Sequence, residues 1–450
     1  MSSPAHPRKR PDIVAHTDPD PIAYETEVYQ KGLKYQRPPF TFKPLEWEPL
    51  AAERMSADTR GYVLGCAGAG ETARKNREAF GKWSIVPRRL GLDLGGGGGG
   101  RGDGKGVFPD LSVEVLGKKL PFPIACAPVG VQKIMNPDGE AAAARAAAGE
   151  GVPFIMSTAS STSIEDVARA SDEGAGAGGR AERWYQLYWP AREHDDITLS
   201  LLSRARKAGF SVLVVTLDTY ILGWRPSDMD NGYNPFLRSD QVGIAIGLTD
   251  PVFRAHFEQK HKRSVDAALG PAAAEWTRTI FPGTGHTLAD VRFLREHWVG
   301  PIVLKGIQSA DDARAVAESG LVDGIVVSNH GGRQADGGMS SLGALPGVVE
   351  AVREANYEGR SKGRRKVDVL FDSGIRCGAD IAKAMALGAK MCLVGRPYVY
   401  GLTLGGQEGV AHVLRSLLGD LELTLHLSGI GAVGPGGLYR GRLVKEDELF

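Results

Sequence analysis

The segment SNHGGRQ, residues 328–334, places an imidazole and a guanidinium directly after the apolar run at 324–327. His330 can take up a proton near neutral pH, because the ordinary pKa of histidine is about 6.5. Arg333, three residues further on, has a planar guanidinium that can bind both oxygens of a carboxylate. The two side chains are therefore suited to proton abstraction beside a bound carboxylate.

Polar groups also follow the apolar runs on either side of this segment. Lys305 lies in PIVLKGI, and a lysine held beside a ring that gains negative charge would stabilise that charge. The segments DSGIRCGAD (372–380) and GRP (395–397) combine glycines with arginines. Because backbone N–H groups and guanidinium groups suit a phosphate, a phosphorylated cofactor or substrate is expected here.

Each of these residues, taken alone, also has a structural explanation. His330 could be a hydrogen-bonded histidine at the end of a strand, and Lys305 could form a salt bridge. Arg376 and Arg396 could be surface cations. Polar groups nevertheless occur at the ends of five successive apolar runs. A barrel without a site does not need that arrangement, so the pattern favours a chemical role.

Eight short apolar runs alternate with helical segments from about residue 120 onward. The helical pattern is clear at 311–319 and 381–388, where small or apolar residues recur at helical spacing. Continuous apolar strands linked by helices indicate a parallel sheet covered on both faces, and eight such units predict an α/β fold, a (β/α)8 TIM barrel. In such barrels the active site lies at the C-terminal ends of the strands. The runs are 121–128, 152–159, 183–190, 211–219, 301–307, 324–332, 367–375 and 390–397.

The chain divides into an N-terminal arm, residues 1–60, and one barrel domain, residues 61–450. The segment 91–106 is rich in glycine and formally contains GxGxxG, but no apolar strand precedes it and no helix follows, so it is interpreted as a flexible linker. Residues 220–286 separate the fourth strand from a helix expected near Thr287. Connections of this length are commonly lids or binding loops, and a lid is predicted here.

The composition is that of an ordinary globular protein, with 42% hydrophobic and 24% charged residues. The net charge of +1 gives no reason to expect nucleic acid or an anionic membrane as a partner. The four cysteines contain no CxxC pair, which argues against a zinc site or a disulfide scaffold. Without a signal peptide, an apolar span or a peroxisomal tripeptide, the expected location is cytoplasmic.

With these motifs in hand, the sequence strongly resembles the FMN-dependent L-2-hydroxy acid oxidising family, which includes glycolate oxidases, lactate oxidases and lactate 2-monooxygenases. SNHGGRQ matches the active-site signature of that family, and YQLY, LKGI and DSGIRCGAD match its other blocks in order. The resemblance extends from about Gly61 to Gly431. It implies FMN as cofactor, a small L-2-hydroxy acid and O2 as substrates, no metal, and a homo-oligomer, often a tetramer.

The resemblance also implies a role for individual residues. His330 is expected to be the catalytic base and Asp218 to orient it. Arg225 and Arg333 would bind the substrate carboxylate, while Tyr62 and Tyr188 would hydrogen-bond the carboxylate and the reacting oxygen. The match at Tyr62 is the weakest, because GCAGAGE follows it where relatives carry more carboxylates. FMN contacts are expected from Pro128, Val129, Gly130, Ser157, Gln186, Thr216, Lys305, Asp372, Gly374, Arg376, Gly395 and Arg396.

Two features bear on the substrate and the reaction. Ala159 stands where glycolate oxidases tend to carry a large aromatic residue, which leaves room for a substrate larger than glycolate. Lactate or a somewhat larger acid is therefore expected, and Ala159→Trp should shift the preference toward glycolate. The segments STASSTSIEDVA, LGWRPSDMDNGY and REHWVGPIVLKGIQ resemble the lactate 2-monooxygenase-like branch. That resemblance implies oxidative decarboxylation of L-lactate to acetate, CO2 and water.

Three alternatives are compatible with parts of the pattern. The first is an oxidase that releases the 2-keto acid and hydrogen peroxide. The second is a phosphate-binding barrel of the IMP dehydrogenase or isomerase type, which would share the phosphate loops but not need His330 together with both arginines. The third is a flavin-binding regulator without activity. It is disfavoured because the base and both carboxylate-binding residues are present. No haem-binding motif is found, so direct transfer of electrons to oxygen is expected.

Overall fold

The structure is a computed structural model of the chain, and it describes most of the residues from 21 to 449. The N-terminal residues 1–20 of the predicted arm and the predicted glycine-rich linker 91–106 lie outside them. The described residues are 21–88, 108–176, 179, 181–237, 242–360, 363–434 and 436–449.

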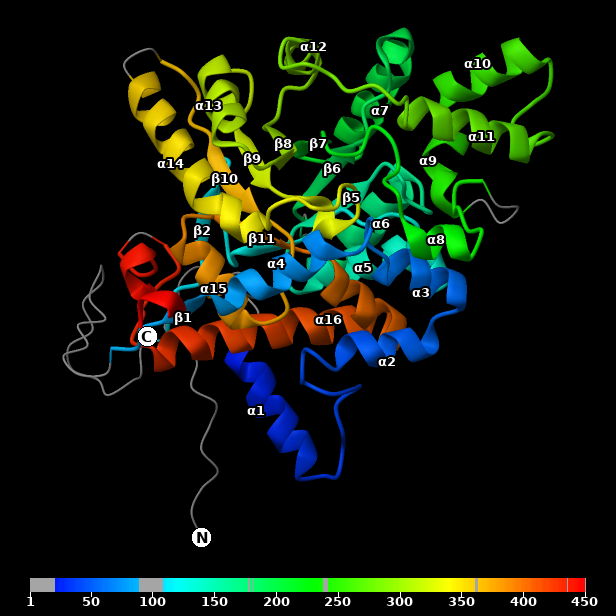
Figure 1. Cartoon of the computed structure of the whole chain (residues 1–450). Coiled ribbons are helices and arrows are strands. Elements are labelled where there is room, and N and C mark those ends of the chain that lie inside the picture. Colours follow the sequence, from blue (N-terminus) through cyan, green and yellow to red (C-terminus); the bar gives the residue numbers. More distant parts are fainter. Residues whose placement is uncertain are drawn as a thin grey trace.

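Eight parallel strands form a closed barrel in the order β10-β11-β4-β5-β6-β7-β8-β9 (Figure 1). Valine, isoleucine and leucine are the commonest residues of the strands, and nearly all of the strand side chains are buried, as expected for a barrel with a packed interior and a helical cover. The predicted TIM barrel is confirmed. The strands are β4 (Ile124–Cys126), β5 (Phe154–Ser157), β6 (Arg183–Leu187), β7 (Val212–Thr216), β8 (Ile302–Ile307), β9 (Gly324–Val327), β10 (Asp368–Phe371) and β11 (Met391–Val394).

Helices cover the outside of the barrel between successive strands. At α13 the Ser309 hydroxyl accepts a hydrogen bond from the backbone of Asp312, and the helix ends at Gly320, which has a φ of 69°. The two helices predicted from apolar spacing are present as α13 and α15. The covering helices are α5 (Gly139–Gly149), α6 (Ile164–Gly174), α7 (Asp195–Lys207), α12 (Val291–His297), α13 (Ala310–Ser319), α14 (Ser341–Arg360), α15 (Gly378–Ala386) and α16 (Arg396–Leu427).

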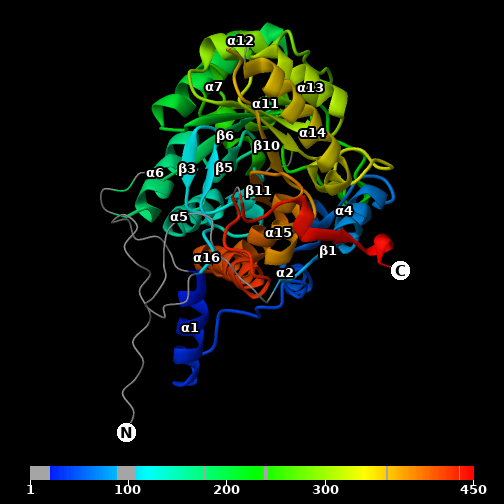
Figure 2. The ribbon, with the colours of Figure 1, turned by 90° about the vertical axis from the view of Figure 1, so that its left-hand side faces the viewer.

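The first two N-terminal helices contact α16, and the chain then continues to Tyr62 at the pocket. Helix α1 projects from the body of the molecule and contacts α16 at its base (Figures 1 and 2). The Tyr24 hydroxyl lies 2.7 Å from Nδ1 of the buried His412, and Phe40 packs against the same imidazole. These contacts anchor the segment that leads to Tyr62 at the pocket. The helices are α1 (Pro21–Gly32), α2 (Trp47–Arg54), α3 (Ala57–Leu64) and α4 (Glu71–Gly81).

Two small antiparallel sheets complete the described strands. Strand β1 (Trp83–Ile85) pairs with β12 (Leu443–Lys445), so the segment that follows α4 is joined to the C-terminal segment. Strand β2 (Val113–Val115) pairs with β3 (Lys118–Leu120). The turn between β2 and β3 contacts the barrel, because the backbone N–H of Leu116 donates to the Asp368 carboxylate at 2.8 Å.

The insertion after β7 is largely helical. It contains α8 (Pro226–Asp230), α9 (Ala245–Leu248), α10 (Pro251–His261) and α11 (Leu269–Ile280). Helices α10 and α11 lie at the side of the molecule near α7 (Figure 1). Asp250, which caps α10, accepts from Ser200 at 2.7 Å and pairs with Arg204 at 3.2 Å, both on α7. The middle of the insertion is thereby fixed beside the barrel, and its two ends reach the mouth.

None of the helices among the described residues is long and apolar enough to cross a membrane. Within the same residues, no group of three or more histidine, cysteine, aspartate or glutamate side chains is placed to hold a metal ion. The four cysteines are free, and two of them are buried.

Candidate active site

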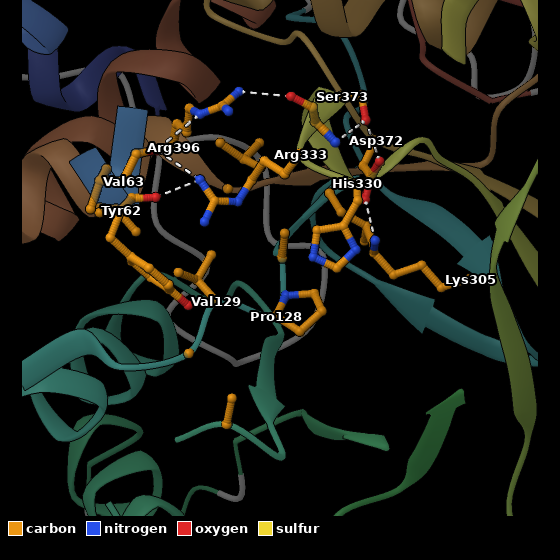
Figure 3. A pocket seen from close by; sticks show the side chains of 18 of the residues that line it. Tyr62, Val63, Pro128, Val129, Lys305, His330, Arg333, Asp372, Ser373 and Arg396 are labelled. Atoms are coloured by element: carbon orange, nitrogen blue, oxygen red, sulfur yellow. Dashed lines mark hydrogen bonds and ion pairs between the residues drawn. The ribbon is translucent and has the colours of Figure 1, made fainter. Parts of the chain in front are cut away.

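One pocket lies at the C-terminal ends of the barrel strands and holds most of the predicted site residues. It has an empty volume of about 1020 Å³, part of it open to solvent, which is on the scale of small-molecule sites. Figure 3 shows His330 and Lys305 on one side and Tyr62 and Arg396 on the other. The predicted residues that line it are Tyr62, Pro128, Val129, Gly130, Tyr188, Arg225, Lys305, His330, Arg333, Asp372, Gly374, Arg376, Gly395 and Arg396.

Four predicted residues lie behind this lining. Asp218 contacts His330, as described below. The Ser157 hydroxyl donates to the side-chain oxygen Oε1 of Gln186 at 2.9 Å, and both side chains are buried. Thr216 is buried on β7 beside Lys305 of β8. The Gln186 amide nitrogen is buried and has no hydrogen-bond partner among the described residues.

The backbone after β9 turns sharply and exposes the His330 side chain to the pocket. His330, Gly331 and Gly332 all have positive φ values, 58°, 68° and 76°. A Cβ at Gly332 would lie 2.6 Å from the backbone nitrogen of Ala73, so only glycine fits there. A positive φ at a histidine is uncommon and persists only where surrounding contacts enforce it. Asn329 supplies such a contact by accepting from Gly332 N–H at 3.1 Å.

His330 is positioned as a base with one ring nitrogen held from behind. Its Nδ1 lies 2.8 Å from Asp218 Oδ1 and 3.0 Å from the Thr219 hydroxyl. With Nδ1–H donated to Asp218, Nε2 carries the lone pair. Burial lowers the pKa of His330, and Asp218 offsets this only in part, so the pKa lies below its usual range. The imidazole is therefore mainly neutral at pH 7 and able to accept a proton.

The groups behind His330 are charged. Burial raises the pKa of Asp218, but His330 and Lys305 outweigh this and lower it to about 2, so the carboxylate is ionised. Lys305 is buried, with Nζ 3.0 Å from the Ser328 hydroxyl and 3.2 Å from Asp372 Oδ2. Burial alone would lower the pKa of Lys305, but the carboxylates of Asp372 and Asp218 raise it. The pocket thus holds a permanent cation beside its base.

Two guanidinium groups face the pocket near Tyr62. Burial and the neighbouring Arg225 lower the pKa of Arg333 to about 10. Arg225 is fixed by a 3.0 Å bond from Nε to the Arg333 carbonyl and by the Gln334 side chain. Asp228 is the nearby carboxylate, but it lies 4.0 Å from Arg225 and burial raises its pKa. Two cations with one weak counter-charge form a site that favours binding of an anion.

A second pair of guanidinium groups lies at the ends of β10 and β11. Burial lowers the pKa of Arg396 to about 10, and its Nη1 donates to the Gly331 carbonyl at 3.1 Å. Arg376 Nη2 lies 3.5 Å from a Glu48 carboxylate oxygen. Arg396 is the first residue of α16, so the N-terminus of this long helix points to the same region. These features fit the phosphate site predicted from DSGIRCGAD and GRP.

Several residues that organise the site were given no role by sequence reasoning, although Asn329 and Ser373 belong to motifs that it singled out. Asn76 and Asn329 exchange amide hydrogen bonds at 2.8 and 2.9 Å, and Ser373 accepts from Gly331 N–H at 3.0 Å. Thr219 and Ser373 adjoin Asp218 and Asp372, so the motifs VTLDT and DSGIR contained a signal for them. Asn76 carried no such signal, because its partner is 253 residues away.

Glu140 is a further missed residue. It is fully buried on α5 and accepts from the backbone of Gln132 at 3.0 Å, from the backbone of Ser161 at 2.8 Å and from the Thr162 hydroxyl at 2.9 Å. These donors come from the segments that follow β4 and β5. Glu140 therefore joins the loops that carry Gly130 and Ala159. A glutamate at the start of a helix has no sequence feature that distinguishes this role.

Comparison with known proteins places this geometry in context. The profile of the FMN-dependent dehydrogenase family matches residues 51–435. An FMN-dependent α-hydroxy acid dehydrogenase of Schizosaccharomyces pombe is 57% identical over 428 residues, which cover 95% of this chain and 97% of that protein. An L-lactate oxidase of Lysinibacillus sphaericus is 37% identical, with 94% of this chain and 97% of the relative covered.

Solved structures agree with these sequence relatives. A crystal structure of mandelate oxidase with (S)-2-phenylpropionate has a TM-score of 0.70 and 30% sequence identity to this chain. The match covers 90% of this chain and 99% of the mandelate oxidase chain. The similarity therefore includes the whole barrel.

Proposed function

The chain belongs to the family of FMN-dependent α-hydroxy acid dehydrogenases and oxidases, and from this premise we propose that it oxidises an L-2-hydroxy acid larger than glycolate with O2 as electron acceptor. The observation that carries the proposal is the placement of one base and one anion site in the same pocket. His330, backed by Asp218, faces the space that Arg225 and Arg333 also line. A substrate carboxylate held by the arginines is thereby brought to the imidazole.

The pocket residues fit FMN. The buried amide nitrogen of Gln186 lacks a partner among the described residues and can donate to a ring acceptor, while the Lys305 cation suits a ring that becomes electron-rich. Arg376, Arg396, Gly374 and Gly395 would hold the phosphate. When bound, FMN accepts two electrons from C2 of the substrate and passes them to the acceptor.

The side chains of this chain would supply binding and proton transfer. Arg225 and Arg333 bind the carboxylate, with Tyr62 and Tyr188 as hydrogen-bond donors. His330 Nε2 takes a proton from the substrate, either from the C2 hydroxyl or from C2 itself, and Asp218 stabilises the imidazolium that results. The 2-hydroxy acid loses two electrons and two protons and becomes a 2-keto acid. In the oxidase outcome O2 gains the two electrons and the two protons and becomes hydrogen peroxide.

The first prediction concerns the cofactor and substrate class. Purified protein is expected to contain FMN, and L-lactate or a larger L-2-hydroxy acid added without oxygen is expected to bleach the visible flavin band. Admission of air should restore it. Absorbance spectroscopy with the D-enantiomers as controls checks this. A colourless protein that does not take up FMN, or a flavin band that no L-2-hydroxy acid bleaches, would contradict the proposal.

The second prediction concerns the product of the oxygen reaction. The decarboxylating outcome inferred from the sequence requires a sheltered site, and it is supported by Leu222, Phe236 and Phe281, which extend from the insertion to the pocket. We propose that these two ends of the insertion act as its lid. With L-lactate, each O2 consumed is then expected to yield one acetate, one CO2 and one water. Pyruvate with stoichiometric hydrogen peroxide would show the simple oxidase outcome, which the names of the relatives support.

The alternatives that lack this redox chemistry are less well supported. A phosphate-binding barrel of the isomerase type accounts for Arg376 and Arg396 but gives no role to Arg225, Arg333 and the His330–Asp218 pair. A silent flavin-binding regulator gives no role to the base. The homo-oligomer expected from the family, a tetramer, stays a prediction that light scattering of the purified protein can test.

A further inference from the structure

Part of the pocket lining is apolar, and some of these residues come from the long insertion. Phe236 lies shortly after α8, and Phe281 directly follows α11, so they enter the pocket from opposite ends of the insertion. Their ring centroids are 5.4 Å apart in an edge-to-face arrangement. Met135, Ala159 and Leu222 line the pocket with them. We call these five residues the apolar wall, and none of them has a polar side chain.

The two aromatic rings are held in place from behind. Phe236 is only 2% exposed, and a Cβ at Gly243 would lie 2.5 Å from its ring, so the ring packs directly on that backbone. Phe281 is the residue that caps the C-terminus of α11, and its backbone N–H donates to the Thr277 carbonyl. Helix α11 is anchored by Trp276, which packs edge-to-face against Phe253 of α10 at 5.1 Å and covers the backbone of Gly247. The helices of the insertion therefore fix the wall, and the wall is a preformed surface.

The apolar wall adjoins the residues that bind and oxidise the substrate. The Phe281 ring centroid is 5.0 Å from that of Tyr188, which is expected to contact the reacting oxygen. Within the apolar wall, Ala159 lies so close to Gly130 that a Cβ at Gly130 would be 2.7 Å from the Ala159 methyl group. Both residues are small, so they take up little of the pocket that they line. Phe281 is only half-buried, so its ring remains accessible to a ligand.

We propose that the apolar wall binds the substrate side chain and selects L-2-hydroxy acids with a branched alkyl or benzyl group over lactate. This inference rests on the proposed function and deepens it. A methyl group would leave the accessible part of the Phe281 ring in contact with water. A larger apolar group removes that surface from water, and each buried methylene contributes favourably to binding. A charged side chain would lose its hydration against this wall without gaining a partner.

The experiment compares three L-2-hydroxy acids that share the reacting group: lactate, 2-hydroxy-4-methylpentanoate and 3-phenyllactate. For the holoenzyme, kcat/KM for both larger acids is expected to exceed that for lactate by about tenfold or more, since a single methylene in an apolar pocket can change it by that factor. Binding without turnover is measured with 3-phenylpropanoate and propanoate, which lack the hydroxyl group. Their perturbation of the flavin spectrum should show at least about tenfold tighter binding of the phenyl compound.

Two substitutions of Phe281 distinguish a loss of substrate selectivity at the apolar wall from general damage to the enzyme. Phe281→Ala should lower kcat/KM for 3-phenyllactate by about tenfold or more while changing that for lactate by less than about threefold. Phe281→Trp should fill the space and lower kcat/KM for the phenyl acid while retaining that for lactate. Phe293→Ala, a partly buried phenylalanine on α12 outside the pocket, is the matched control and should leave the ratio of the two acids unchanged.

The outcomes distinguish this inference from the function on which it rests. Equal efficiency on all three acids, or an equal loss on all three in Phe281→Ala, would overturn the role of the apolar wall and leave the oxidation of 2-hydroxy acids in place. If no L-2-hydroxy acid bleaches the flavin, the proposed function fails and the inference fails with it. A preference for the larger acids that Phe281→Trp diminishes supports the role of the apolar wall and the proposed function.

Discussion

The His330→Gln variant is expected to bind FMN normally and to oxidise its substrate about 10⁴-fold more slowly than the native protein. Glutamine retains hydrogen bonding but cannot take up a proton at neutral pH. His330 is the neutral base that faces the pocket in the described part of the chain, and Asp218 behind it stays ionised with a pKa of about 2. The rate of flavin bleaching under anaerobic conditions measures the step directly, without the reaction with oxygen.

Two controls test whether the loss of rate comes from the missing base alone. FMN content and melting temperature should match the native protein, because His330 contacts Asp218 and Thr219 and its loss leaves the phosphate site intact. Thr219→Val removes the other hydrogen bond to Nδ1 and should cost less than about tenfold, since the carboxylate still sets the tautomer. A His330→Gln variant that retained more than a tenth of the native bleaching rate would rule out this histidine as the base.

The pH dependence follows from the same contacts. The base works only when neutral, so kcat/KM should fall as the pH drops through the His330 pKa, which burial holds below the ordinary 6.5. In Asp218→Asn the carboxylate that raises this pKa is gone, so the inflection should move to still lower pH while the rate falls about 10²- to 10⁴-fold. The pH profiles of the two proteins check this, and an inflection that moves to higher pH would contradict it.

The barrel and the reacting residues were predictable for one physical reason. Strands buried on both faces require continuous apolar runs, and parallel strands bring their C-terminal ends to one rim. Lys305, His330 and Arg396 each follow or end such a run, so their convergence could be inferred without knowing any contact between them. Their detailed roles came from the family motifs. The close pairing of Asp218 with His330 agrees with the expected orientation, although its distance could not have been given.

The apolar wall could not be predicted in the same way. Phe236 and Phe281 belong to an insertion whose helices have no fixed relation to the strand order. Their approach depends on the packing of Trp276 on Gly247, and sequence spacing does not encode that contact. The insertion was expected to be a lid, which stays a prediction, and the position of its middle part against α7 through Asp250 and Arg204 had no signal in the sequence. Glu140 was missed for a related reason, because its partners are backbone groups that any residue could supply.

The remaining large effect concerns the carboxylate site. Arg333→Met is expected to lower kcat/KM for the 2-hydroxy acid by about 10³-fold, because loss of one member of a buried charge pair costs roughly 2–5 kcal/mol. Arg333→Lys should recover only part of this, since an ammonium group cannot bind both carboxylate oxygens in a planar fork. Steady-state kinetics and the affinity of a 2-keto acid for the oxidised holoenzyme measure the loss.

A neutral substrate separates the charge effect from the structural role of Arg333, which also donates from Nη1 to the Gly65 carbonyl at 2.9 Å. The amide of the same 2-hydroxy acid carries no negative charge, so Arg333→Met should change its kcat/KM by less than about tenfold. If the variant lost acid and amide equally, Arg333 would act through the α3 segment and not through the carboxylate. Arg225 lies close enough to lower the pKa of Arg333, so removing either cation also relieves repulsion at the other. The fold-loss of kcat/KM in the double variant should therefore be smaller than the product of the two single fold-losses.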